Sequence, residues 1–232
     1  MKLSIIIPCF NEIKTIKQIL FNVNKSYTNE KEIIIVDDGS IDGTKEFLKT
    51  IESTEDIKIF FNEKNFGKGA ALKKGFREAS GEIILIQDAD LEYNPKDYNN
   101  LLLAFKEVNA DVVYGTRFKG GRYNRVMYFK NYVANNILTF FCNMLTGLNL
   151  SDMETGYKVF KREVIKSIQI EEKSFGVEAE ITIKLAKKKY KFFEVPISYN
   201  GRTYEEGKKI RCKDFFDAIF CIIKYSMRRA EK

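Results

Sequence analysis

The sequence predicts an α/β domain built on a mostly parallel sheet. Its first half contains five short apolar runs, at 3–8, 32–37, 57–62, 82–88 and 111–116. Amphipathic stretches separate these runs, at 13–24, 44–53, 69–80 and 95–109. Such alternation is typical of a parallel sheet covered by helices. The runs at 33–36 and 83–86 show little alternation of apolar and polar residues, which indicates strands that are buried on both faces.

Capping residues mark where the helices of the first half begin. Ser40 or Asp42 is placed to cap the helix at 44–53, because a short side-chain oxygen accepts hydrogen bonds from the free N–H groups of a helix start. Pro95 opens the stretch at 95–109, and proline is tolerated in a first turn, where the missing N–H has no partner within the helix. Each of these helices therefore begins a few residues after a strand end.

The second half lacks this regular alternation. It predicts a helix rich in Phe, Leu and Ile at 127–145, strands at 157–160 and 191–198, and helices at 177–188 and 213–229. No linker rich in proline, glycine or serine divides the two halves, and no internal repeat is visible. We therefore predict one domain over residues 1–211. At 212–232 an amphipathic helical extension follows, which packs on the domain or lies at a membrane surface.

Composition excludes several kinds of site. The 232 residues include no histidine, which rules out Ser-His-Asp and Cys-His mechanisms and histidine-ligated metals. The four cysteines are widely spaced, so zinc ligation and a disulfide framework are not expected, and free thiols fit a reducing compartment. Acid–base chemistry and metal binding therefore fall to aspartate and glutamate.

Charge and hydropathy indicate where the protein works. The formal net charge of +7 fits an anionic partner, such as a phosphorylated small molecule, an acidic membrane surface or a nucleic acid, and it fits equally a lysine-rich solvated surface. No apolar run reaches the roughly 18 residues of a membrane span, and the run at 3–8 is too short for the core of a signal peptide. We therefore expect a cytoplasmic protein.

Acidic residues follow three of the first four predicted strands. Glu12 comes shortly after the first strand, Asp37 and Asp38 end the second, and Asp88 and Asp90 follow the fourth. In an open parallel sheet the ligand binds beyond the carboxyl ends of the strands, which is where these side chains meet. One such acid would be read as a turn or capping residue, but five at one edge favour a binding site.

The Asp88-x-Asp90 pair after a buried strand has a specific chemical use. Carboxylate oxygens are the ligands that Mg²⁺ or Mn²⁺ prefers, and such a metal commonly shares its coordination shell with substrate phosphates. The metal then offsets charge on a leaving diphosphate. The pattern predicts a divalent-metal site for a phosphorylated substrate.

Five motifs occur in order along the chain: Pro8-x-x-Asn11-Glu12, Val36-Asp37-Asp38-Gly39-Ser40, Asn65-Phe66-Gly67-Lys68-Gly69-Ala70, Gln87-Asp88-Ala89-Asp90 and Gly115-Thr116-Arg117-Phe118. Together they resemble family 2 glycosyltransferases with the GT-A fold, a Rossmann-like sheet flanked by helices. The later segments at 152–158 and 202–210 resemble the branch of dolichyl-phosphate mannose and glucose synthases and bacterial polyprenyl-phosphate glycosyltransferases. The resemblance covers about residues 3–211.

On the donor side, the resemblance implies three groups of residues. Those that would line the nucleotide pocket and hold the base and ribose of a UDP- or GDP-sugar are Pro8, Asn11, Glu12, Asp37 and Asp38. Those that would let a loop pass close to the nucleotide are Gly67, Lys68 and Gly69. Those that would coordinate Mg²⁺ or Mn²⁺ and the diphosphate are Asp88, Asp90 and Glu92. Glu92 stands where some relatives have glutamine, so it either binds the metal or faces solvent.

On the acceptor side, the resemblance implies a group of cations. Arg117 would bind the acceptor phosphate, and the residues that would close over the diphosphate or that phosphate are Arg202, Lys208 and Lys209. Related synthases often carry a second arginine shortly after a Gly-Gly segment. The nearest cations here are Arg122, Arg125 and Lys130, and the sequence leaves open which of them replaces it.

The expected reaction inverts the configuration at the sugar C1, because one nucleophile attacks opposite the leaving nucleoside diphosphate. The predicted catalytic residues are Asp90, Arg117 and Asp152. A polyprenyl phosphate acceptor is already an anion and needs cations to position it, whereas a hydroxyl acceptor needs a carboxylate base. Asp152 is the candidate for that base, or else it organises the cations.

Other interpretations stay open at this point. The first is a family 2 transferase that adds a sugar to a hydroxyl of a polysaccharide or lipopolysaccharide. A nucleic-acid-binding protein would show a basic stripe or a recognised module, and a nucleotidyltransferase would show a Gly-rich loop after the first strand, and neither is visible. The apolar helices at 127–145 and 213–229 predict peripheral contact with the cytoplasmic membrane face. The alternative is that both helices pack on the core or pair in a homo-oligomer.

Overall fold

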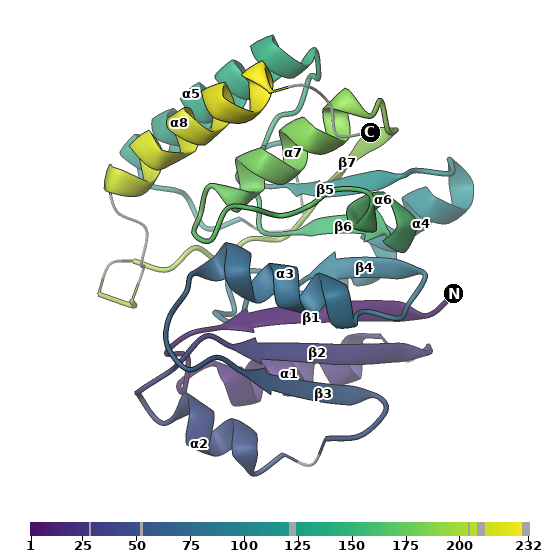
Figure 1. Cartoon of the computed structure of the whole chain (residues 1–232), viewed down its shortest axis with the longest axis vertical. Coiled ribbons are helices and arrows are strands. Elements are labelled where there is room, and N and C mark those ends of the chain that lie inside the picture. The colour runs from purple at the N-terminus through teal and green to yellow at the C-terminus, as the bar shows by residue number, and fades with distance from the viewer. Residues whose placement is uncertain (28, 52, 121–123, 204, 208–211, 229–232) are drawn as a thin grey trace.

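The computed structural model describes the whole chain except residues 28, 52, 121–123, 204, 208–211 and 229–232 and the side chains of residues 212 and 213. Its strands form one seven-stranded sheet in the order β3-β2-β1-β4-β6-β5-β7. The strands are β1 (Leu3–Cys9), β2 (Lys31–Asp37), β3 (Ile57–Phe61), β4 (Ile83–Ile86), β5 (Val112–Thr116), β6 (Lys158–Lys161) and β7 (Phe192–Pro196). Figure 1 shows this sheet running through the middle of the molecule. The predicted α/β fold class is therefore confirmed.

Strand β6 runs against its two neighbours, whereas all other pairs of neighbouring strands in the sheet are parallel. It pairs antiparallel with both β4 and β5 and lies between them, although it follows both in the sequence. Because β6 runs in the opposite direction, the segment that enters it arrives at the edge where β4 and β5 end. Residues 152–157 therefore reach the same edge as Asp88, Asp90 and Arg117.

The helices of the described residues are α1 (Ile16–Ser26), α2 (Thr44–Lys49), α3 (Lys68–Glu78), α4 (Tyr98–Glu107), α5 (Phe129–Thr146), α6 (Arg162–Lys166), α7 (Val177–Lys187) and α8 (Cys212–Met227), with a 3₁₀ turn η1 (Pro95–Asp97) ahead of α4. They cover both faces of the sheet. Ile6 and Ile34 pack with residues of α3 and α7 on one face, whereas Ile5 and Ile33 pack with residues of α1 and α4 on the other. This two-sided burial accounts for the non-alternating isoleucine runs.

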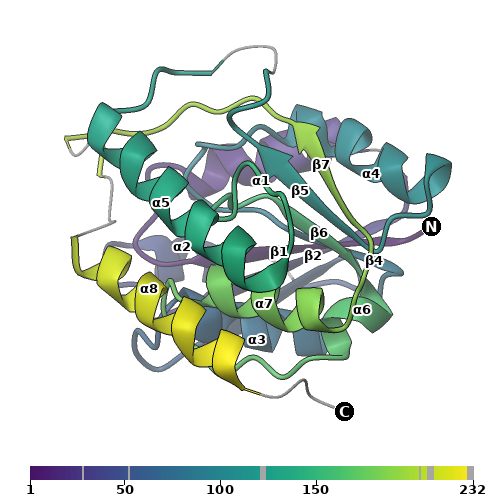
Figure 2. The same ribbon diagram turned by 90° about the horizontal axis from the view of Figure 1, so that it is seen from above.

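Helices α5 and α8 form a further layer outside α7. Figures 1 and 2 show the two helices side by side, and α8 contacts both α5 and α7. Ala218, Ile222 and Tyr225 bury the inner side of α8 in the core. None of the helices in the described ranges combines the length and hydrophobicity that crossing a bilayer requires. The predicted domain boundary at residue 211 stays a prediction.

Three local features refine the predicted elements. Helix α2 is shorter than predicted, and Asp42 supports its start, since Asp42 Oδ1 accepts a hydrogen bond from Thr44 N at 3.0 Å. The next predicted helix begins with the turn η1, where the Asn94 side chain accepts from a backbone N–H two residues on. Helix α6 was not predicted, because five residues are too few to produce a helical period in the sequence.

Glu32 organises the opposite edge of the sheet, where the parallel strands begin. It is fully buried, and its Oε2 accepts a hydrogen bond from Lys58 Nζ at 2.9 Å. Its Oε1 accepts from Ser4 Oγ at 2.5 Å, Ser80 N at 2.6 Å and Gly81 N at 3.1 Å. Burial by itself would raise the pKa of Glu32, but these donors outweigh it and lower the pKa to about 2.

We expect Glu32→Gln to lower the free energy of unfolding at neutral pH by about 2 to 3 kcal/mol. The ionised carboxylate stabilises the fold above its ordinary pKa of 4.5, and this contribution is lost as the pH falls toward about 2. Urea unfolding at about pH 7 and about pH 3 tests this, because the gap between the two proteins should shrink at the lower pH.

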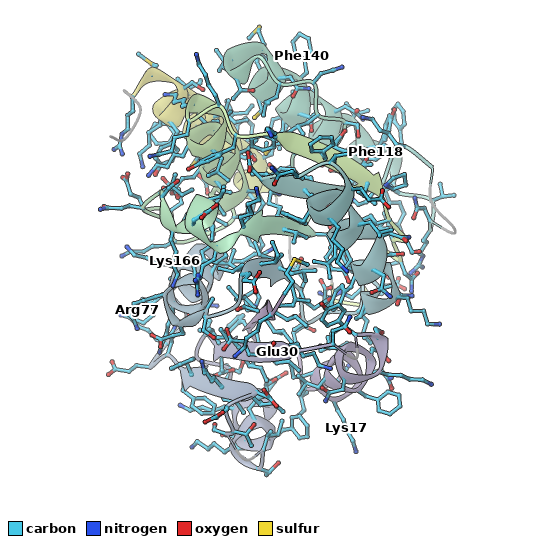
Figure 3. The ribbon with its side chains drawn as sticks, turned by 90° about the vertical axis from the view of Figure 1, so that its right-hand side faces the viewer. Lys17, Glu30, Arg77, Phe118, Phe140 and Lys166 are labelled. Carbon is cyan, nitrogen blue, oxygen red and sulfur yellow. The ribbon has the colours of Figure 1, made fainter. Side chains whose placement is uncertain are left out.

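The matched control is Glu30→Gln, which alters an exposed carboxylate at the same edge, labelled in Figure 3. It should change the free energy of unfolding by less than about 0.5 kcal/mol. Equal losses in the two variants would contradict the role assigned to Glu32.

Candidate active site

A pocket of about 580 Å³ opens at the edge where the parallel strands end. The segments that line it follow β1, β4 and β5, precede β6 and α7, and belong to α3, α5 and α8. Of the residues predicted from the sequence, the pocket is lined by Pro8, Glu12, Asp38, Gly67, Lys68, Asp88, Asp90, Glu92, Arg117 and Arg202. The structure thus brings predicted donor residues and predicted acceptor residues to one cavity, but the lining does not include Asn11, Asp37, Gly69 or Asp152.

Asp88 is held from two sides. Lys68 Nζ lies 2.9 Å from Asp88 Oδ1 and 2.9 Å from Glu178 Oε1. Burial would lower the pKa of Lys68, but Asp88 and Glu178 outweigh it and raise that pKa well above its ordinary value. On the other side, a Cβ on Gly156 would come within 2.3 Å of Asp88 Oδ2. Any side chain at Gly156 would therefore displace the Asp88 carboxylate.

Asp90 belongs to a carboxylate cluster that surrounds Arg202. The Arg202 guanidinium lies 3.1 Å from Glu12 Oε2, 3.0 Å from Asp90 Oδ2 and 3.7 Å from Glu92 Oε1. Burial, together with Asp88 and Glu92, raises the pKa of Asp90 to about 7, and Arg202 offsets only part of this effect. Within the described residues, three carboxylates thus surround one guanidinium.

Glu92 anchors the segment that carries Arg202. Its Oε2 accepts a hydrogen bond from Tyr199 Oη at 2.7 Å, and its Oε1 accepts one from Arg202 N at 2.7 Å. Between the two carboxylates, Leu91 has a φ of 63°, a left-handed conformation that bulky residues rarely adopt. A strained turn therefore separates Asp90 from Glu92 at the wall of the pocket.

The donor set fits a divalent cation that completes its shell with phosphate oxygens. Asp88 and Asp90 supply hard carboxylate oxygens, and burial together with the neighbouring Asp88 and Glu92 raises the pKa of Asp90, so a cation there would favour its charged form. In the part of the chain that the structure describes, no three acidic or cysteine side chains form a metal site by themselves. The predicted role of Glu92 as a third ligand stays a prediction, because both of its oxygens here hold Tyr199 and Arg202.

Arg117 is fixed by Asp152 in a bidentate pair. Arg117 Nε donates to Asp152 Oδ2 at 2.7 Å and Nη2 donates to Asp152 Oδ1 at 2.7 Å, while Arg117 N donates to Oδ2 at 3.1 Å. Nη2 also donates to Asn135 Oδ1 at 3.0 Å, and the guanidinium lies 5.1 Å from the centre of the Tyr199 ring. Among the described residues Nη1 makes no hydrogen bond, so Arg117 can offer it to an anion in the pocket.

Asn11 and Asp37 connect the loops that follow β1 and β2. Asn11 has a φ of 52°, which asparagine tolerates, and its Oδ1 accepts a hydrogen bond from Ile41 N at 2.9 Å. Asp37 is fully buried, and its Oδ2 accepts from Ser40 N at 3.2 Å, while its Oδ1 has no partner within the described ranges. The predicted roles of Asn11 and Asp37 beside a nucleotide stay predictions.

Asp38, Gly67 and Gly69 shape the loop that leads into α3. Asp38 Oδ2 accepts a hydrogen bond from Gly67 N at 2.7 Å. A Cβ on Gly67 would lie 2.2 Å from Lys173 O, and one on Gly69 would lie 2.1 Å from Glu172 O. The glycines therefore allow the 172–173 backbone to approach closely, a contact that the sequence did not indicate. Their predicted approach to a nucleotide stays a prediction.

Some of the predicted site residues lie outside the described ranges, and some residues of the pocket were not predicted from the sequence. Lys208 and Lys209 lie outside the described residues. Among the polar residues that line the pocket without a role in the sequence analysis are Asn131, Asn135, Glu154, Ser174 and Glu178. Nothing in the sequence singled out Asn135, because the same helix also contains Asn131, Asn136 and Asn143, whereas Glu154 stands within the motif at 152–158. Glu178 resembled an ordinary acidic residue in the first turn of a helix.

Solved glycosyltransferase structures share this fold. Glucosyl-3-phosphoglycerate synthase from Mycobacterium tuberculosis, in complex with UDP, matches with a TM-score of 0.73 at 17% identity, over 97% of this chain and 80% of that one. The same enzyme in complex with Mn²⁺, UDP and phosphoglyceric acid gives a TM-score of 0.72 at 17% identity, over 100% and 80%. At this identity the likeness shows the fold alone, which is the predicted GT-A fold.

Sequence similarity identifies both the class of enzyme and the family to which the chain belongs. Residues 4–169 match glycosyl transferase family 2. The protein is a glycosyltransferase, and the chain belongs to glycosyl transferase family 2. It is 28% identical over 222 residues to dolichol-phosphate mannosyltransferase of Pyrococcus furiosus, over 94% of this chain and 62% of that protein. It is also 28% identical over 222 residues to undecaprenyl-phosphate mannosyltransferase of Micrococcus luteus, over 90% of this chain and 87% of that protein. The resemblance stated from the sequence is confirmed.

Proposed function

We propose that the protein transfers a hexose from a UDP- or GDP-sugar to a polyprenyl phosphate, with inversion and with Mg²⁺ or Mn²⁺. The observation that carries this proposal is the presence, in one pocket, of the acidic cluster around Arg202 and of an arginine fork held by Asp152. The acidic cluster suits a metal-bound diphosphate. The fork at Arg117 suits a second phosphate group.

On the donor side, Asp88 and Asp90 would hold the metal. When bound, a divalent cation there would offset the negative charge that develops on the departing nucleoside diphosphate. Arg202 supplies a second positive charge at the same place, since its guanidinium lies 3.0 Å from Asp90 Oδ2. Glu12 pairs with Arg202 at the same place, and we assign it to the wall of the nucleoside subsite.

On the acceptor side, the hydrogen bonds of Asp152 favour an anionic acceptor over a hydroxyl acceptor. Both oxygens of Asp152 accept hydrogen bonds from Arg117, and the side chain is fully buried, so it is poorly placed to remove a proton from a hydroxyl acceptor. A phosphate monoester needs no such base, because it is already an anion at neutral pH. We therefore infer that Asp152 positions Arg117, and that a phosphate oxygen attacks the sugar C1 opposite the diphosphate.

The names of two relatives support the choice of sugar and acceptor. Both are called mannosyltransferases, one for dolichol phosphate and one for undecaprenyl phosphate. Mannose is therefore the first sugar to test with this chain, and a long-chain polyprenyl phosphate is the first acceptor.

A screen of donors and acceptors tests the proposal. The protein is given GDP-mannose or UDP-glucose with Mg²⁺ or Mn²⁺, and either a short polyprenyl phosphate or the matched polyprenol without phosphate. We expect nucleotide release and a sugar-lipid product with the phosphate acceptor only, and a product whose anomeric configuration is opposite to that of the donor. Transfer to a saccharide hydroxyl, with none to the lipid phosphate, would instead establish the hydroxyl-acceptor function.

The outer sides of α5 and α8 are suited to a membrane surface. Large exposed apolar side chains there are Phe129, Val133, Ile137, Phe140, Met144, Phe216, Phe220, Ile223 and Met227. Figure 3 labels Phe140 on α5, at the periphery of the molecule. The inner sides of the same helices line the pocket through Asn131, Leu138 and Phe215. A polyprenyl chain could therefore stay in the bilayer while its phosphate reaches Arg117, and the net charge of +7 would favour anionic lipid.

We expect the double variant Phe216→Ser/Phe220→Ser to bind anionic vesicles at least about tenfold more weakly than the wild type. These side chains are 67% and 66% exposed, so the change removes apolar contact with lipid without opening a cavity in the core. Sedimentation with phosphatidylglycerol vesicles at low salt measures the effect, and added salt should weaken the binding of the wild type. The control is Phe21→Ser on α1, where the side chain is 60% exposed. Wild-type protein that stays in the supernatant at low salt would contradict the membrane assignment.

A further inference from the structure

The pocket contains two glutamates that the donor and acceptor assignments leave unused. Glu178 lies in the first turn of α7, and Glu154 lies in the segment that leads into β6. Glu178 is 6% exposed, and its Oε1 pairs with Lys68 Nζ at 2.9 Å. Within the described residues, Glu178 Oε2 and Glu154 Oε1 are buried and have no hydrogen-bond partner. Each glutamate therefore has an oxygen free to accept a hydrogen bond from a ligand.

Among the described residues, nearby cations balance the charge of these two glutamates only in part, since Lys68 is shared between Glu178 and Asp88. Lys158 is buried nearby, but its ammonium group donates to Met153 O at 2.8 Å and Thr155 O at 2.5 Å. Burial and the neighbouring Glu178 raise the pKa of Glu154 to about 7. Buried carboxylate oxygens without partners cost free energy, and proteins mostly keep such groups where they act on a ligand.

Lys68 places the two glutamates beside the proposed diphosphate site. The same ammonium group that pairs with Glu178 lies 2.9 Å from Asp88 Oδ1. In a nucleotide-sugar the sugar is joined directly to the diphosphate, so a donor held at Asp88 has its sugar within reach of Glu178. Ala71, Leu138 and Phe175 line the pocket as well, and such apolar groups suit the C–H faces of a sugar ring.

We propose that Glu154 and Glu178 accept hydrogen bonds from hydroxyl groups of the transferred sugar, and that the part of the pocket beside them is the sugar subsite. This inference rests on the proposed function, whose donor is a nucleotide-sugar. A carboxyl oxygen without a partner can accept a hydrogen bond from a sugar hydroxyl group. The subsite therefore selects a neutral hexose with free hydroxyl groups, and it rejects a sugar that carries its own carboxylate, because two like charges would meet inside the pocket.

Binding measurements without an acceptor test the subsite. Calorimetry with Mg²⁺ compares GDP-mannose with GDP, and UDP-glucose with UDP, in wild type, Glu178→Ala, Glu178→Gln and Glu154→Gln. For whichever nucleotide pair the wild type binds, we expect each variant to bind the nucleotide-sugar about 10- to 100-fold more weakly. Binding of the matching nucleoside diphosphate should change less than about threefold. Equal weakening of the two ligands would overturn the proposal, because Glu178 would then act only through Lys68 and Asp88.

Two further readouts separate recognition of the sugar from a structural role. Glu154→Gln should keep or raise the melting temperature, because it removes a buried carboxylate that has an oxygen without a partner among the described residues, whereas a structural role predicts a lower value. The wild type should bind UDP-glucuronate at least about tenfold more weakly than UDP-glucose, and the Gln variants should narrow that gap. A wild type that binds both sugars equally would contradict the selection of a neutral hexose.

A control variant, and the comparison of donor binding with transfer to the acceptor, separate this inference from the proposed function. Glu163→Gln alters an exposed glutamate on α6 and should leave both binding constants unchanged. A protein that shows the sugar-dependent loss in the variants, yet transfers nothing to polyprenyl phosphate, would keep the subsite and lose the proposed acceptor. A wild type that binds no nucleotide-sugar would overturn both.

Discussion

Asp90→Asn should reduce sugar transfer by about a thousandfold or more while the protein stays folded. Asparagine cannot provide the negative charge that a hard divalent cation requires, and the leaving diphosphate then loses part of its stabilisation. Asp88 and Glu92 repel the negative charge of Asp90, so removal of that charge lowers the repulsion among the three carboxylates. We therefore expect an unchanged or higher melting temperature, measured beside nucleotide release over a range of Mn²⁺ concentrations.

The control for this change is Asp56→Asn, an exposed residue between α2 and β3. It should transfer sugar at the wild-type rate and respond to Mn²⁺ as the wild type does. Turnover that continues undiminished in excess EDTA would show that the reaction does not depend on a metal at Asp90.

Arg117→Lys should raise the KM for polyprenyl phosphate by about a hundredfold, with less than about a threefold change in the KM for the nucleotide-sugar. Lysine keeps the positive charge that Asp152 needs, but it cannot offer the planar fork that binds Asp152 and a phosphate together. Arg117→Ala should lose still more, because it leaves the fully buried Asp152 carboxylate without its partner.

Initial rates over a matrix of donor and acceptor concentrations separate the two constants. Asp152→Asn combined with Arg117→Ala removes the unpaired charge, so its melting temperature should exceed that of Arg117→Ala alone. Equal increases in both KM values for Arg117→Lys would show that Arg117 does not belong to the acceptor site.

The acidic edge was predictable because it depends on local signals. Isoleucine runs define β1, β2 and β4, and in a parallel sheet the acids that follow these strands must meet at one edge. The motif resemblance then indicated roles for Asp88, Asp90 and Arg117. The apolar helix at 127–145 was predicted for the same reason, since its composition alone defines it, and it corresponds to α5.

The pairings within the site were not predictable, because they join residues far apart in the chain. Nothing local to Lys68 indicates that it bridges Asp88 and Glu178. The position of β6 had no signal either, since a four-residue strand does not reveal its direction or its neighbours. That direction brings Glu154 to the pocket and Asp152 behind Arg117, so a topological feature that periodicity cannot show decides which charges lie at the pocket.

The position of Arg202 makes ligand entry an ion-exchange step. Its guanidinium contacts Glu12, Asp90 and Glu92 at distances between 3.0 and 3.7 Å. In the proposed function, a divalent cation that takes the Asp90 oxygen would release Arg202 from it, and the guanidinium, still beside Glu12 and Glu92, could then contact the donor diphosphate as well. Metal and nucleotide-sugar should consequently favour each other's binding, because the metal frees a contact of Arg202 that the diphosphate can take.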